Sequence, residues 1–154
     1  MRSPASRDGT LVIGYGNGMR GDDGAGPAAA RLLSRCGFEA LAVHQLTPEL
    51  AERVAAARAV FFLDASADVA PGEISVQPIE AAAAPRTLEH YASPGAILRL
   101  AREAYGAAPD AWLIAVGAVG FEFGAGLSPA AEGAVLRAVE QVRSAAPPGR
   151  PPTA

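Results

Sequence analysis

Short runs of apolar residues alternate with segments of helical periodicity along most of this chain. The apolar runs indicate buried strands, because they are too short for helices and three of them lack polar alternation. We therefore expect strands at residues 10–16, 40–46, 59–65, 72–79 and 110–119. Pro78 lies within the fourth of these segments, and proline is typical of an edge strand or a strand end.

Helical patterns fill the intervals between the expected strands. A Ser or Thr followed by proline marks several starts, and Gly37 marks one end, so we expect helices over residues 23–37, 47–58, 93–105 and 128–144. Residues 80–92 give the weakest pattern. Strands that alternate with helices predict an α/β fold, here a three-layer α/β/α domain with a mostly parallel, twisted sheet of about five strands.

The length of 154 residues favours a single domain that spans residues 1–154, with a core of about 9–144. Residues 1–8 are polar and residues 145–154 are rich in proline, so both ends are expected to be flexible tails. In such folds the functional site lies beyond the carboxyl ends of the strands.

Composition excludes several classes of function. All 13 basic residues are Arg, which excludes a Schiff-base lysine and a P-loop lysine. The net charge of −3 argues against a nucleic-acid partner. The single cysteine, Cys36, forms neither an internal disulfide nor a thiolate cluster. The start of the chain has no apolar signal segment, and no apolar run approaches the roughly 18 residues of a membrane span, so we expect a cytoplasmic protein.

A glycine-rich turn, GYGNGMRGDDG, follows the first expected strand. A dinucleotide fingerprint needs glycine where Met19 stands, and two adjacent carboxylates would repel a pyrophosphate. The turn is better suited to a cation, because Gly14 and Gly16 permit a tight backbone turn and Asn17 can brace it. Two neighbouring acids, Asp22 and Asp23, then project from the turn, although helix capping is a competing explanation for each of them.

Asp64 directly follows the apolar run VFFL, which places it at the carboxyl end of a central strand beside the glycine-rich turn. A carboxylate there is costly to bury unless it is paired or binds a cation. Each of the two histidines, His44 and His90, is by itself more typical of a structural hydrogen bond. Together, however, Asp23, Asp64 and His90 offer two carboxylates and one imidazole, a set that suits Zn²⁺ or Ni²⁺.

Serine hydrolysis is the competing chemistry, and the sequence disfavours it. The chain has no G-x-S-x-G nucleophile motif, and neither Ser66 near Asp64 nor Ser93 near His90 forms a recognised nucleophile setting. The paired-histidine motif of zinc proteases is absent as well.

Five segments resemble the [NiFe]-hydrogenase maturation endopeptidases. GYGNGMRGDDGAG resembles that family's G-x-G-N-x-x-x-x-D-[DE]-G-x-G signature. HQLTPEL, FFLDA, LEHYASPGAIL and GFEFGAGLSPA then resemble its Thr turn, its strand-end Asp, its L-x-H-x-x-S stretch and its late Gly-Leu-Ser segment, in the same order. The resemblance thus covers most of the chain.

The resemblance implies an endopeptidase, of the metal-dependent or aspartyl type, that removes the C-terminal extension of a hydrogenase large-subunit precursor. The family acts only after nickel has been inserted, so the nickel is supplied by the substrate and no resident cofactor is required. Carried over by position, the catalytic and nickel-binding residues fall on Asp23, Asp64 and His90. The expected supporting residues are Gly14, Gly16, Asn17, Asp22, Gly24, His44 and Thr47.

Two positions depart from the family's pattern, since Asp23 is often Glu there and His44 is often Asp. We hypothesise that the substrate nickel serves for recognition and as a Lewis acid, and the identity of a general base stays open. The resemblance also favours a monomer, and the apolar surface that grips the partner is expected in the loops at 66–72 or 118–127. The alternatives are another metal-dependent hydrolase on the same scaffold, or a non-catalytic module that binds the nickel-containing precursor.

Overall fold

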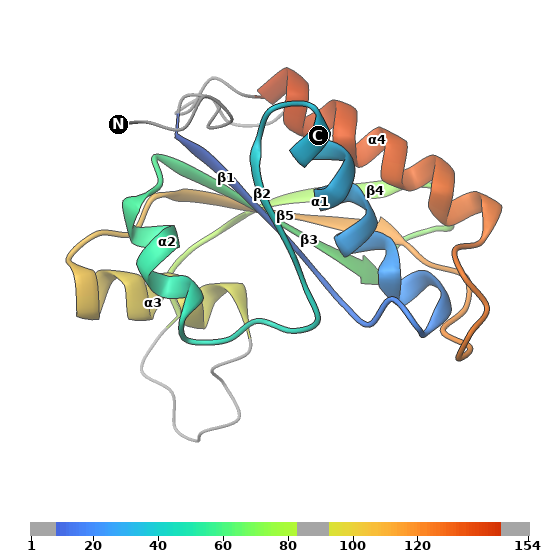
Figure 1. The fold of residues 1–154 in the computed structure, drawn as a ribbon, viewed down its shortest axis with the longest axis horizontal. Coiled ribbons are helices and arrows are strands. Elements are labelled where there is room, and N and C mark those ends of the chain that lie inside the picture. The colour runs from blue at the N-terminus through green and yellow to red at the C-terminus, as the bar shows by residue number, and fades with distance from the viewer. Residues whose placement is uncertain (1–8, 83–92, 146–154) are drawn as a thin grey trace.

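The computed structural model of the chain describes residues 9–82 and 93–145, and in them five strands form one sheet (Figure 1). The strand order is β2-β1-β3-β5-β4, and only the β4–β5 pair is antiparallel. This arrangement confirms the expected mostly parallel sheet and places the strand that contains Pro78 at an edge. The strands are β1 (Thr10–Tyr15), β2 (Glu39–Val43), β3 (Ala59–Ser66), β4 (Ile74–Ile79) and β5 (Asp110–Gly117).

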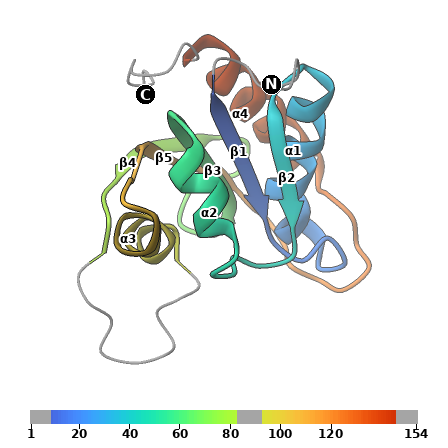
Figure 2. The same cartoon turned by 60° about the vertical axis from the view of Figure 1, so that its left-hand side comes forward.

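Helices cover both faces of the sheet, as the three-layer prediction requires. The helices α1 and α4 lie on one face, while α2 and α3 lie on the other (Figures 1 and 2). Their bounds are α1 (Ala25–Arg35), α2 (Leu50–Ala56), α3 (Pro94–Tyr105) and α4 (Pro129–Ala145), and a short 3₁₀ turn, η1 (Gly21–Gly24), precedes α1. No helix in these described ranges is long and apolar enough to cross a membrane.

Several element ends differ from the sequence prediction. The expected strand over 40–46 ends at Val43, because the chain leaves the sheet edge there and Leu46 turns into the core beside Leu50. The helix expected from residue 47 begins at Leu50, since residues 47–49 form a turn in which the Leu50 amide donates to the Thr47 carbonyl at 3.1 Å. Ala145, assigned to the tail, ends α4 and is buried. The other tail residues lie outside the described ranges.

The start of the third helix follows the prediction closely. The Ser93 hydroxyl accepts a hydrogen bond from the Ala96 amide at 3.2 Å, and Pro94 occupies the first turn. Gly106 ends the helix with a φ of 80°. Such a capped start and a left-handed end are typical of stable helix boundaries.

Alternation along the central strands divides the core into two halves. In β3, Phe61 and Leu63 face α1 and α4, whereas Val60 and Phe62 face α2 and α3. Since successive side chains point to opposite faces of a strand, Asp64 falls on the same face as Phe62, beyond the end of the apolar run. The buried core thus ends where the polar residues begin, at the carboxyl edge of the sheet.

Candidate active site

Asp64 lies at the carboxyl end of the central strand β3, half-buried, as the sequence predicted. The parallel register pairs Gly14 of β1 with Leu63 of β3, so Tyr15 and Asp64 are the next residues along neighbouring strands. On its other side Asp64 pairs with Ala115 of β5. A small side chain at that position leaves the carboxylate with one bulky neighbour in the sheet, Tyr15.

The environment of Asp64 raises its pKa to about 6. Burial is the largest cause, because it disfavours the charged form. Hydrogen bonds from the Tyr15 hydroxyl and the Ala65 amide act in the opposite direction, and the negative charge of Asp23 adds a further increase. Asp64 therefore changes its ionisation close to neutral pH and interacts electrostatically with Asp23, the second acid of the predicted set.

Tyr15 is a site residue that the sequence reasoning missed. Its hydroxyl is hydrogen-bonded to Asp64, and burial, together with the nearby charge of Asp64, holds the Tyr15 pKa well above its usual range. The hydroxyl therefore stays protonated and donates to the carboxylate. The alternation of Leu11, Ile13 and Tyr15 on one face of β1 is the signal that could have placed it beside Asp64.

We expect Tyr15→Phe to raise the pKa of Asp64 further, because the variant loses a hydrogen bond to the ionised carboxylate and keeps the burial. A carboxyl-carbon NMR titration of Asp64 in wild type and variant measures this shift. Tyr105→Phe is the matched control, since Tyr105 is 52% exposed at the end of α3. An unchanged Asp64 titration in Tyr15→Phe would contradict the assigned hydrogen bond.

Asp23 is held by the backbone of the glycine-rich turn. Its Oδ2 accepts a hydrogen bond from the Asn17 amide at 2.6 Å. Gly16 precedes that amide with a φ of 145°, and a Cβ there would lie 2.0 Å from the Asp23 carbonyl oxygen. Only glycine fits this position, so Gly16 serves the turn as expected. The Asn17 side chain also braces the turn, because its Oδ1 accepts from the Met19 amide at 2.9 Å.

The approach of β1 to α1 brings the turn close to β3. A Cβ on Gly14 would lie 2.0 Å from the Gly26 carbonyl oxygen, so strand and helix touch through their backbones. A Cβ on Gly24 would meet the Cα of Gly18 at 3.0 Å. The glycines of the motif therefore serve close packing, which positions Asp23 near Asp64.

Asp22 has a different environment from its neighbour. It is 1% exposed, and its carboxylate accepts four hydrogen bonds from the loop that follows β5. The donors are the Val119 amide (2.7 Å), the Gly120 amide (3.3 Å), the Ser128 amide (2.7 Å) and the Ser128 hydroxyl (2.8 Å). Capping of the first helix therefore does not explain Asp22, which ties the first βα turn to the start of α4.

Ionisation of Asp22 follows from these contacts. Burial raises its pKa, but the hydrogen bonds from Ser128, Val119 and Gly120 lower it by more, and the net pKa lies below the usual range. The carboxylate is thus charged at neutral pH and fully occupied by its donors. It supports the site through the loop rather than by facing Asp64.

His44 and Thr47, two expected supporting residues, lie beyond the end of β2. The Gly16 amide donates to the Val43 carbonyl at 3.1 Å, so the exposed His44 follows directly at the same sheet edge as the glycine-rich turn. The Thr47 hydroxyl instead donates to Glu49, whose pKa it lowers. Thr47 therefore organises the turn before α2.

The described residues bring two of the three predicted metal ligands together, Asp23 and Asp64. His90 lies outside the described ranges. Within those ranges no group of three or more His, Cys, Asp or Glu side chains is arranged to hold a metal ion. Two carboxylates give only part of the coordination shell of a transition metal. Any further ligands must come from other groups, including those of a molecule that delivers the metal.

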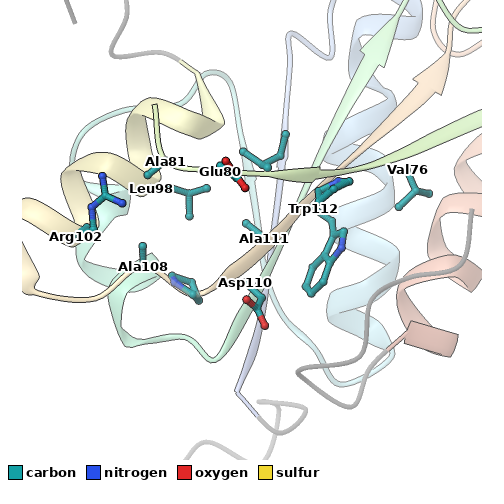
Figure 3. Close-up of a pocket in the computed structure, with 12 residues that line it drawn as sticks. Val76, Glu80, Ala81, Leu98, Arg102, Ala108, Asp110, Ala111 and Trp112 are labelled. Atoms are coloured by element: carbon teal, nitrogen blue, oxygen red, sulfur yellow. The ribbon is translucent and has the colours of Figure 1, made fainter. Parts of the chain in front are cut away.

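A pocket of about 690 Å³ is shown in Figure 3 with the side chains that line it. It is formed where β5 begins and β4 ends, and α3 contributes Leu98 and Arg102. None of the predicted site residues in the described ranges lines it. Because its walls belong to the amino end of β5, this pocket is separate from the Asp23–Asp64 site.

A mostly parallel sheet that is covered by helices on both faces, with two carboxylates at its carboxyl edge, defines the class as an α/β protein. Its fold is like that of hydrogenase maturation proteases. The chain is similar to HybD from Thermococcus kodakarensis, a [NiFe] hydrogenase maturation protease. The two share 26% identity over 88% of this chain and 97% of that chain, with a TM-score of 0.68.

Other solved structures agree. The hydrogenase 2 maturation peptidase of a Thaumarchaeota archaeon has 25% identity and a TM-score of 0.64, with 88% of this chain and 96% of that chain covered. The hydrogenase maturating endopeptidase HybD from E. coli shares the fold, with a TM-score of 0.63 and 24% identity. The alignment covers 88% of this chain and 90% of that chain. No protein-family model and no curated protein matches the sequence. The structural likenesses confirm the resemblance seen in the motifs and support a peptidase.

Proposed function

We propose that this chain is an endopeptidase that removes the C-terminal extension of a nickel-loaded [NiFe]-hydrogenase large-subunit precursor. The observation that carries the proposal is the pairing of Asp23 and Asp64 at the carboxyl edge, in a fold similar to maturation proteases over 88% of the chain. The net charge of −3 favours a protein partner over nucleic acid. We further propose that the protein acts in the cytoplasm as a monomer.

The proposed mechanism uses nickel as part of the substrate. The metal arrives with the precursor, and Asp23, Asp64 and His90 complete its coordination. A divalent ion bound there polarises the scissile carbonyl or activates a water molecule. The burial that raises the pKa of Asp64 to about 6 also sets a requirement, because the carboxyl must lose its proton before it binds a cation.

Deletion of the gene tests the proposal in the host. We expect one nickel-containing large-subunit precursor to accumulate, and we expect wild type but not His90→Ala or Asp64→Ala to restore the mature mass. Normal processing in the deletion strain would contradict the proposal and favour a hydrolase with another substrate. A purified chain that binds the precursor without changing its mass would instead indicate a non-catalytic binding module.

A further inference from the structure

Five large hydrophobic side chains are exposed in the described ranges: Met19, Tyr105, Val119, Phe123 and Leu136. Three of them, with exposed fractions of 61% for Met19, 59% for Val119 and 73% for Phe123, belong to the two loops at the carboxyl edge of the sheet. Large apolar side chains that gather at one place on a soluble protein typically mark an interaction site.

The two loops that carry these side chains are joined through their backbones. Arg20 and Phe123 form an antiparallel bridge, and the Gly124 amide donates to the Met19 carbonyl at 2.6 Å. The Val119 amide donates to the buried Asp22 carboxylate at 2.7 Å. The exposed side chains are therefore held on a braced backbone, and a partner that binds them has little loop ordering to overcome.

Hydrogen bonds connect this apolar surface to the candidate active site. The Asp23 Oδ2 accepts from the Asn17 amide at 2.6 Å, and the Asn17 Oδ1 accepts from the Met19 amide at 2.9 Å. Met19 is thus two hydrogen bonds away from a proposed nickel ligand. The turn that presents Asp23 to a bound polypeptide therefore also carries Met19.

We propose that Met19, Val119 and Phe123, together the apolar rim, bind apolar side chains of the precursor polypeptide next to the bond that is cut. This inference rests on the proposed function, which requires a protein chain at the adjacent carboxylates. The exposed charges between the rim residues, Arg20 and Glu122, are of opposite sign, so the surface favours neither a polyanion nor a polycation. Met and Phe are also typical of protein interface cores.

Single substitutions on the rim test the proposal with the purified full chain and a nickel-loaded precursor. Met19→Ser and Phe123→Ser are each expected to raise KM by about tenfold or more and to leave kcat within about twofold, since they remove apolar burial but no catalytic group. Leu136→Ser is the matched control, because Leu136 is 63% exposed on α4, away from these loops, and should leave KM unchanged.

Binding of nickel-free precursor separates this proposal from the proposed function. We expect the Kd to rise for the two rim variants and not for the control, whether or not wild type cleaves the loaded precursor. If wild type binds the precursor but does not cleave it, the proposed protease function is wrong and the proposed binding role of the apolar rim stands. If KM and Kd are unchanged in both rim variants, the proposed binding role of the rim is wrong. A wild-type dimer that Phe123→Ser dissociates without a change in Kd would also overturn it, and would assign the surface to a second copy.

Discussion

Asp64→Asn is expected to abolish precursor processing while leaving the folded protein at least as stable as wild type. The loss of rate should be about a hundredfold or more, the range for removal of a group that acts on the reacting centre. Stability is preserved because asparagine keeps an oxygen that can accept from Tyr15 and Ala65 and carries no charge into the half-buried site.

The stability of wild type should also depend on pH with a definite sign. The folded-state pKa of Asp64, about 6, lies above the ordinary value of 3.8 for this carboxyl group, so the folded chain binds more protons than the unfolded chain between these two values. This group's contribution to stability is therefore present at low pH and is lost as pH rises through about 6. Asp64→Asn should not lose stability in this way as pH rises. The unfolding temperature of the variant should therefore exceed that of wild type by a growing margin as pH rises through about 6.

Thermal unfolding below and above pH 6 measures the effect on stability. The intact mass of the precursor measures the effect on processing. Asp68→Asn is the control, since Asp68 is an exposed carboxylate just beyond β3. That variant should process the precursor at the wild-type rate. If Asp64→Asn also processed it normally, Asp64 would have no role in the chemistry.

Asp22→Ala is expected to produce the largest loss of stability. The substitution leaves three backbone amides and the Ser128 hydroxyl without their shared acceptor. The cost of unpaired donors and of the vacated space should total about 3 to 5 kcal/mol. For a chain of this length that corresponds to a fall of roughly 10 °C in Tm.

Ser128→Ala is the graded control for Asp22. It removes one donor to Asp22 and the acceptor for the Ala131 amide, and it should cost about 1 to 2 kcal/mol. Because the pKa of Asp22 is lowered in the folded state, its contribution to stability is present above the ordinary value and is lost as pH falls through the lowered one. A Tm for Asp22→Ala close to that of Ser128→Ala would show that the four hydrogen bonds do not stabilise the fold.

Periodicity along the chain predicted the sheet well, because buried parallel strands such as 59–63 read as unbroken apolar runs. Asp64 was found for the same reason, since the first polar residue after such a run falls at the carboxyl edge. Strand ends at the sheet edge were less predictable. The segment after Val43 stays apolar at Leu46, yet that residue packs beneath α2 and not in the sheet.

Contacts between distant parts of the chain could not be read from local pattern. Asp22 looks like a helix cap in sequence, and its partners lie 97 to 106 residues away. Tyr15 reads as one more strand residue until the β1–β3 register places it beside Asp64. The apolar rim likewise depends on the bridge between Arg20 and Phe123. Local sequence patterns predict which side chains share one face of a strand or helix. The packing of the elements in the folded chain decides which of these faces come into contact.

The most direct test of the proposed function is the intact mass of a large-subunit precursor after incubation with the purified protein, with and without inserted nickel. We predict the loss of a C-terminal segment from the nickel-loaded precursor and an unchanged mass for the nickel-free one. An unchanged mass in both samples would contradict the assignment as an endopeptidase, and equal cleavage in both would contradict the recognition of nickel by Asp23, Asp64 and His90.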